Sequence, residues 1–270
     1  LGAVYIAARY FQLYLTTDLA SGRSIHKQAR YRWSWERKFN GRLDDDYSAL
    51  FRLADIFNGP DATYVEGLEN TIDVEEWITA FALRHVVGDW DGYGYNRGKN
   101  TFLYRPNSAP WRLLLWDLDF SLGCNGGHGP TQNIFTVEGG ATEISRLYNH
   151  PHFRRVYFRA LQRAVDGPLL PDRSTPIIQS RYQALQANNV TTVSPLAASG
   201  AQNISIPEWI RQRREFILGQ IPSASFAITS NSGASFATNR NYIRLTGTAP
   251  VAIRTLRLNG QILPLTWTSV

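Results

Sequence analysis

The sequence predicts an α+β fold in which a mostly helical body carries one β-hairpin and is followed by a short β-rich tail. Apolar residues recur at helical spacing over much of residues 142–222 and in two earlier segments. Two apolar runs on either side of a proline-containing turn at 106–110 predict the hairpin. Beyond Pro222 the chain becomes rich in Ser, Thr, Asn and Gly, so we expect one domain over residues 1–222 and another over 223–270.

The composition is that of a chain with a packed core. Of its 270 residues 43% are hydrophobic, which argues against bulk disorder, and no apolar run is long enough to cross a bilayer. Cys124 is the only cysteine, which excludes an internal disulfide and argues against a cysteine-based zinc site. The chain starts at Leu1, contains no Met and stops at Val270 inside an expected strand, so we expect it to be part of a longer polypeptide.

The net charge of +6 suits an anionic partner such as a nucleotide or an acidic protein. Basic residues are dense between residues 23 and 42, where Trp33 and Trp35 lie among them. A nucleic-acid patch would have this pattern, but a solvated basic face over two core tryptophans explains it as well and is the commoner case. We therefore expect no nucleic-acid partner.

The first elements differ in how clearly they are marked. Residues 1–16 are apolar and aromatic, and their pattern fits either a strand or a buried helix. Residues 18–46 are polar, basic and expected to be irregular. Apolar positions at helical spacing predict a helix over residues 47–57, which Asn58, Gly59 and Pro60 would end.

The best-marked helix begins after Asp73. This residue is a favourable N-cap, and Glu76 follows three positions later as in a capping box. One apolar face of the helix includes Trp77 and His85, so we expect His85 to be a hydrogen-bonded core residue. The helix leads into a polar, glycine-containing loop at residues 89–100.

Strands are expected at residues 101–105 and 111–116, with Asp117 and Asp119 just beyond the second one. Helices follow as far as residue 222, and the clearest of them covers residues 207–221. The tail has short β-like runs, which we expect to be the first strands of an immunoglobulin-like sandwich. These runs are residues 226–229, 242–245 and 253–258, and the hairpin dipeptide Asn259-Gly260 follows the last of them.

Four carboxylates form two close pairs, Asp89 with Asp91 and Asp117 with Asp119. Alternate residues of an extended segment point to opposite sides, so we expect one inward and one outward carboxylate in each pair. Inward carboxylates that meet would repel unless a cation lies between them, and magnesium is the natural candidate because it prefers oxygen ligands. Asn96 or Asn100 could add a neutral oxygen ligand.

This arrangement suits phosphoryl transfer, in which one Asp orients the attacking hydroxyl while an Asn and a second Asp hold metal. Asp91 and Asn96 have the spacing of a protein-kinase catalytic loop. Asp and Asn are also ordinary loop and capping residues, so the spacing alone does not decide the function. Gly92 and Gly94 lack the strand and helix context of a dinucleotide fingerprint, and no Walker motif is present.

The segment HVVGDWDGYGYNRGKNTFLYRPNSAPWRLLLWDLDFSLG resembles the core of the CotH (spore coat protein H) kinase family. The resemblance rests on Trp90-Asp91, on Asn100 ahead of an aromatic strand, on Trp116-Asp117-Leu118-Asp119 and on Gly123. It extends over about residues 20 to 222, including the closing helix IPEWIRQRREFILGQI.

The resemblance implies an atypical protein-kinase-like fold and transfer of phosphate from ATP, with Mg or Mn, to Ser or Thr of surface or spore-coat proteins. It implies that Asp91 is the catalytic residue, that Asp117 and Asp119 bind metal, and that Asn96 or Asn100 binds the metal and nucleotide. It also implies a bacterial protein that is secreted or on the cell surface, with further β modules in the parent chain.

Two departures from the family pattern stand out. Asp89 replaces the Asn that often precedes Trp-Asp, which adds a negative charge. The N-terminal lobe is expected to be largely missing, because residues 1–40 offer no convincing nucleotide lysine with an acidic partner, and neither Lys27 nor Lys38 is assigned that role. This segment alone is therefore expected to bind nucleotide poorly and to transfer no phosphate.

Two other functions are compatible with the same residues. One is a catalytically inactive kinase-like scaffold or binding module of a cell-surface protein. The other is a metal-dependent phosphoesterase, against which the lack of a His-rich metal cluster counts.

Overall fold

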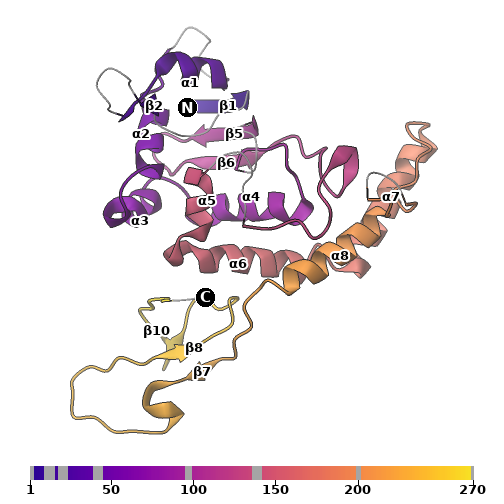
Figure 1. Ribbon diagram of the computed structural model, residues 1–270. Helices are drawn as coiled ribbons and strands as arrows, with labels where there is room; N and C mark the ends of the chain where they lie inside the picture. Colours follow the sequence, from indigo (N-terminus) through magenta and orange to yellow (C-terminus); the bar gives the residue numbers. More distant parts are fainter. Residues whose placement is uncertain are drawn as a thin grey trace.

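The computed structural model describes residues 3–8, 16–17, 24–38, 45–94, 99–135, 142–198 and 202–268. Four strands form an antiparallel sheet, and a layer of helices packs below it in the view of Figure 1. In sheet order the strands are β4 (Trp35–Arg37), β1 (Ala3–Ala8), β5 (Lys99–Arg105) and β6 (Arg112–Leu115). The fold is therefore α+β, as the sequence predicts.

The predicted hairpin is confirmed, since β5 and β6 pair antiparallel with Leu103 opposite Leu113. The open choice for residues 1–16 is settled in favour of a strand over residues 3–8, which pairs with β5. A two-stranded ribbon follows, formed by β2 (Thr16–Thr17) and β3 (Ser24–Ile25). The sheet thus brings the start of the chain next to the hairpin that leads to Asp117.

The expectation of irregular structure over residues 18–46 is wrong for part of this segment. Residues Gln28–Ser34 form helix α1, which leads directly into β4. Tyr31 and Trp35 are buried in the core, and the ring of Tyr31 lies edge-on to Phe51 at 4.8 Å. Trp33 remains 52% exposed, so only one of the two tryptophans is a core residue. Tertiary packing of two aromatic side chains outweighs the basic, helix-neutral composition here.

The predicted helices at 47–57 and after Asp73 are confirmed as α2 (Ser48–Phe57) and α4 (Val74–Val87). Helix α3 (Asp61–Glu69) lies between them and has no strong apolar periodicity in the sequence. The Asp73 carboxylate accepts a hydrogen bond from the Glu76 backbone N at 3.0 Å, as expected of an N-cap. Helix α4 ends at Gly88, whose φ of +67° is the left-handed conformation that glycine adopts readily.

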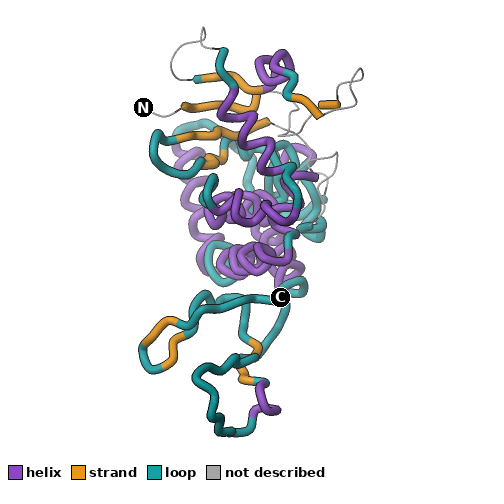
Figure 2. Tube along the Cα trace, turned by 90° about the vertical axis from the view of Figure 1, so that its left-hand side faces the viewer, coloured by secondary structure: helices purple, strands orange, loops and turns teal. Residues whose placement is uncertain are grey.

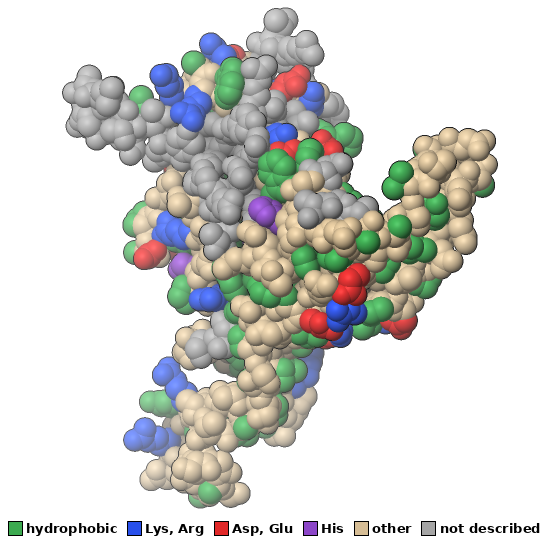
Figure 3. Space-filling model, turned by 45° about the vertical axis from the view of Figure 1, so that its right-hand side comes forward, with side chains coloured by type: hydrophobic (Ala, Val, Ile, Leu, Met, Phe, Trp, Pro, Cys, Tyr) green, Lys and Arg blue, Asp and Glu red, His purple; other side chains and the backbone are tan. Residues whose placement is uncertain are grey.

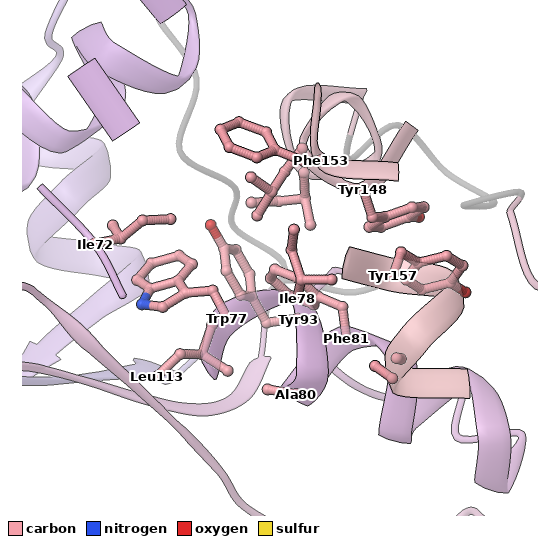
Figure 4. Close-up of a cluster of buried hydrophobic side chains, with 14 of the residues drawn as sticks. Ile72, Trp77, Ile78, Ala80, Phe81, Tyr93, Leu113, Tyr148, Phe153 and Tyr157 are labelled. Carbon is pink, nitrogen blue, oxygen red and sulfur yellow. The ribbon is translucent and has the colours of Figure 1, made fainter. Parts of the chain in front are cut away.

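Helix α4 lies at the centre of the core. In Figure 4, Trp77, Ile78 and Phe81 of α4 lie among Leu113 of β6 and Tyr148 and Tyr157 of the neighbouring helices. The helices that cover its far side are α5 (Thr142–Asn149) and α6 (Pro151–Val165). Because α4 is packed on both sides, the residues at its C-terminal end have fixed positions.

His85 is a buried, hydrogen-bonded core residue, as the sequence predicts. Its Nδ1 lies 2.7 Å from the hydroxyl of Tyr157, and that hydroxyl donates to the carbonyl of Ile134. A hydroxyl has one proton, so Nδ1 of His85 must be the donor to Tyr157. Burial, followed by the charges of Arg213 and Arg84, lowers the pKa of His85 to about 3.

The helical prediction for residues 142–222 is also confirmed. Helix α7 (Pro171–Ala187) and the segment after it project from the body (Figures 1 and 3). Helix α8 (Ile206–Leu218) returns to the body with Pro207 in its first turn, as expected. Arg213 of α8 is fully buried and donates to the carbonyl oxygens of Val86 at 3.3 Å and Pro130 at 3.0 Å.

The tail holds two separate two-stranded ribbons (Figure 2). One is formed by β7 (Ala227–Ile228) with β8 (Gly247–Thr248), and the other by β9 (Arg257–Leu258) with β10 (Gln261–Ile262). The Asn259-Gly260 hairpin is confirmed, with positive φ at both residues. Residues 242–245 form no strand, and the immunoglobulin-like sandwich and the boundary at residue 223 stay predictions.

Candidate active site

The two aspartate pairs lie at the ends of elements that the core holds in place. Asp89 and Asp91 follow the left-handed cap of α4, and Asp117 and Asp119 follow β6. Strand β5 begins at Lys99 and pairs with β6, which joins the two regions through the hairpin.

Asp91 is 3% exposed and is held by two residues at the start of β5. Its carboxylate Oδ2 lies 2.6 Å from Nζ of Lys99 and accepts from Nδ2 of Asn100 at 3.3 Å. Nδ2 of Asn100 also donates to the backbone carbonyl of Asp91 at 2.7 Å. These contacts fix both the backbone and the side chain of the residue that the sequence predicts to be catalytic.

Asp89 is completely buried and forms an ion pair with Arg84 of α4. Burial raises the pKa of the Asp89 carboxyl, whereas the charge of Arg84 and a hydrogen bond from the Asp91 backbone N lower it. The expectation of one inward and one outward carboxylate is wrong for this pair, because both are buried. The cation next to Asp89 is a side chain of the protein, and it offsets the additional negative charge noted in the sequence.

Arg84 has 1% of its side chain exposed, and the sequence reasoning assigned it no role. Besides Asp89, its guanidinium donates to the carbonyl of Asn100, to Thr101 Oγ1 at 3.3 Å and to the carbonyl of Trp116 at 3.3 Å. Burial lowers the pKa of Arg84, and the nearby charges of Asp89, Asp91 and Asp117 oppose this effect. Gly92 makes room for this group, because a Cβ there would overlap the Arg84 guanidinium.

Asp117 and Asp119 are both exposed, so the inward–outward expectation is wrong for this pair as well. Desolvation, followed by the charge of Asp119 and a hydrogen bond with it, raises the pKa of Asp117, and Lys99 lowers it. Asp91 also raises the pKa of Asp117, which places the two pairs within electrostatic reach of each other. Asp117 has a φ of +55° and Asn100 a φ of +57°, a conformation that Asp and Asn tolerate better than most residues.

The structure thus brings Asp91, Asn100 and Asp117 into one region, with Asp119 beside Asp117 and Lys99 beside Asp91. Asn96 lies outside the described residues. Within the described ranges, no group of three or more His, Cys, Asp or Glu side chains forms a ready-made metal cage. The donors are carboxylate and amide oxygens, which fit Mg²⁺ or Mn²⁺, and Mg²⁺ is commonly bound by one or two carboxylates together with substrate phosphates.

Helix α8 packs against the segments that lead to this site. Nε1 of Trp209 donates to the carbonyl of His128 at 3.0 Å, and the Trp209 ring leaves no room for a Cβ at Gly88 or Gly123. The glycine at 123 that forms part of the family resemblance is therefore required by the packing of a helix far along the sequence.

The sequence pattern of the CotH kinase protein family matches residues 9–217. The chain belongs to the CotH kinase family. Inner spore coat protein H of Bacillus subtilis (strain 168) is 21% identical over 154 residues, which are 56% of this chain and 41% of that protein. The chain therefore spans less than half the length of the curated relative that it matches. The family match confirms the resemblance and begins earlier in the chain than the expected residue 20.

Within the described residues, no helix is both long enough and apolar enough to span a bilayer.

Proposed function

We propose that the protein containing this chain is a protein kinase that transfers phosphate from ATP to Ser or Thr hydroxyls. The observation that supports this function best is the buried Asp91 carboxylate, held by Lys99 and Asn100 within electrostatic reach of Asp117. A catalytic carboxylate, an amide next to it and a second carboxylate beyond a hairpin are the parts that phosphoryl transfer uses.

Asp91 is the proposed base. Its carboxylate accepts the proton of the attacking hydroxyl or holds that hydroxyl in line with the phosphate. The contacts from Lys99 and Asn100 to Oδ2 restrict its orientation. A fixed carboxylate lowers the entropic cost of reaching the reactive geometry.

Asn100, Asp117 and Asp119 are the proposed metal ligands. The amide nitrogen of Asn100 faces Asp91, so its oxygen is the atom that can bind a cation. Bound Mg²⁺ or Mn²⁺ would offset the negative charge of the ATP phosphates. Lys99 adds a positive charge at the same place, which also favours a phosphate group.

The acceptor proteins and the location are proposed from the relatives. Inner spore coat protein H is named as a coat component, so we propose a bacterial surface or coat location and acceptor proteins of the same kind. A kinase-like fold, ATP as the nucleotide and further β modules belong to the same proposal.

Transfer of label from ATP tests this function. The full-length protein is incubated with γ-labelled ATP, Mg²⁺ or Mn²⁺ and a panel of acceptor proteins. We expect Asp91→Asn to abolish labelling without unfolding the protein, because Asn keeps the shape and removes the charge. Asp172→Asn, in the first turn of α7, is the matched control and should label like the wild type.

If neither the wild type nor the variants transfer label although all are folded, the kinase proposal is wrong. An inactive scaffold would then be the better explanation. Release of phosphate from simple esters without ATP would instead point to a phosphoesterase.

A further inference from the structure

We propose that Arg84 is the positioning residue of this site, holding the segment of Asp91, the start of β5 and the end of β6 in one fixed arrangement. The proposal rests on the function proposed above and adds to it a buried residue that acts through other residues of the site. Arg84 lies on α4, between the buried residues Phe81 and His85.

The contacts of Arg84 reach every segment that carries a site residue. Nη1 pairs with the Asp89 carboxylate, which in turn accepts from the backbone N of Asp91 at 3.1 Å. Nη2 donates to the carbonyl of Asn100 and to that of Trp116 at 3.3 Å. The planar guanidinium of Arg84 therefore joins the segment that contains Asp89 and Asp91 to both strands of the hairpin.

The two carbonyl acceptors lie where the backbone turns toward the site. Asn100 has a φ of +57°, and Trp116 directly precedes Asp117, whose φ is +55°. Asn and Asp tolerate such angles better than most residues, but surrounding contacts are still needed to hold them there. The Arg84 guanidinium supplies those contacts, and so determines where the Asn100 and Asp117 side chains point.

The absence of a side chain at Gly92 leaves space for this group. A Cβ at Gly92 would overlap Nη1 of Arg84 and lie too close to Cζ and Nε as well. Gly92 therefore allows the guanidinium to approach the backbone closely.

Arginine suits this task better than lysine because its guanidinium is a planar fork with five donors. An ammonium group at residue 84 could still pair with Asp89. It is a compact point charge, however, and could not reach the carbonyls of Asn100 and Trp116 at the same time. The variant Arg84→Lys thus keeps the positive charge opposite Asp89 but removes the hydrogen bonds that position the Asn100 and Trp116 segments.

The experiment compares full-length wild-type protein with Arg84→Lys and with Arg84→Met/Asp89→Asn, in which no buried charge is left unpaired. Arg155→Lys is the matched control, because Arg155 is a buried arginine whose carbonyl acceptors, Ala249 and Pro250, lie in the tail. For each protein we measure the melting temperature, kcat and KM for ATP, and amide hydrogen exchange of the segments 89–94 and 116–119.

We expect both Arg84 variants to lose at least tenfold in kcat at temperatures where they are fully folded. Amide exchange of the two segments should rise at least tenfold, because the donors that hold them are gone. Arg155→Lys should melt lower than the wild type and keep its kcat and its exchange pattern at the site.

The proposal is overturned if folded Arg84→Lys or the double variant keeps kcat within twofold and unchanged exchange in both segments. Amide exchange is read in the absence of any reaction. If the wild type transfers no phosphate, the kinase function fails, and exchange still decides whether Arg84 positions the two segments.

Discussion

His85 and Asp89 lie four residues apart, and both are buried, yet their hydrogen-bond partners differ in charge. His85 faces the neutral hydroxyl of Tyr157 and is also near two arginines, so burial and charge together favour the neutral ring. Asp89 faces the guanidinium of Arg84, whose charge opposes the rise in the pKa of the Asp89 carboxyl that burial causes. The partner therefore decides whether a buried titratable group keeps its charge.

The depressed pKa of His85 predicts a specific pH dependence of stability. The folded pKa is about 3 and the ordinary value is 6.5, so the unfolded state takes up the proton first as pH falls. The stability that neutral His85 contributes is complete above pH 6.5 and is lost as pH falls toward 3, by about 1.4 kcal/mol per pH unit.

His85→Gln keeps a hydrogen-bonding group and cannot titrate. We expect the difference in unfolding free energy between wild type and His85→Gln to shrink as pH falls from 7 to 4, measured by urea denaturation. A constant difference over that range would contradict the assigned burial of His85.

A single methyl group at Gly92 should destabilise the fold, because a Cβ there overlaps the buried Arg84 guanidinium. We expect Gly92→Ala to lose about 1–3 kcal/mol of unfolding free energy, as overpacked cores do. Gly219→Ala is the control, since a Cβ there meets only ordinary contacts. Equal melting temperatures for the two variants would rule out the close approach of Arg84 to Gly92.

The residues of the proposed site could be selected from the sequence because Asp91, Asn100 and Asp117 lie in a local motif. Arg84 could not, because its acceptors lie 5, 16, 17 and 32 residues away and depend on how the hairpin packs against α4. The contact between Asn100 and Asp91 also depends on the fold, and Asn96 lies outside the described residues. Only a paired β5 shows that Asn100 reaches Asp91.

Among the elements, those with local signals were predicted and those formed by tertiary packing were not. Helix α4 begins after Asp73, as the sequence predicts, and ends at Gly88, directly before the expected loop at 89–100. Helices α1 and α3 have weak caps or little amphipathic periodicity, and their buried aromatic residues, Tyr31 and Tyr64, pack against distant segments.

Glu76 shows how a residue chosen for a local role can join two elements. Instead of closing a capping box, its carboxylate accepts from the Leu113 backbone N at 3.0 Å and pairs with Arg112 of β6. We expect Glu76→Ala to lose about 1–3 kcal/mol of unfolding free energy, because the hairpin donor loses its acceptor.

Glu76→Gln keeps an acceptor for Leu113 and should retain most of that stability. Glu66→Ala, at an exposed position on α3, should change it by less than about 0.5 kcal/mol. The comparison is made by chemical denaturation, and equal losses for Ala and Gln would show that the Leu113 contact contributes nothing.

At the scale of the whole molecule, the tail packs against the helical body. Val251 is 4% exposed and packs in the main core, and Nη2 of Arg155 donates to the carbonyl of Ala249 at 3.1 Å. Arg254 of the tail pairs with Glu75 of α4 at 2.6 Å. The change in composition after Pro222 predicted that short β-strands replace helices there. It did not predict that this tail packs against the helices.

Docking of the tail predicts a selective effect of Val251→Asp. A carboxylate without a partner in this buried position should release the tail, because burying an unpaired charge is costly. We expect limited proteolysis to cleave residues 223–248 faster in the variant, while the helical body remains protected. Val190→Asp, at an exposed position after α7, is the control and should be cleaved like the wild type.

Binding of Mn²⁺ together with ATP tests most directly whether the two aspartate segments form one nucleotide–metal site. The full-length protein is titrated with Mn²⁺ at fixed ATP, and bound Mn²⁺ is measured by electron paramagnetic resonance. We predict that Asp117→Asn weakens Mn²⁺–ATP binding at least tenfold and that the exposed Asp172→Asn leaves it unchanged. Equal binding by the wild type and Asp117→Asn, or no binding by the folded wild type, would contradict the proposed site.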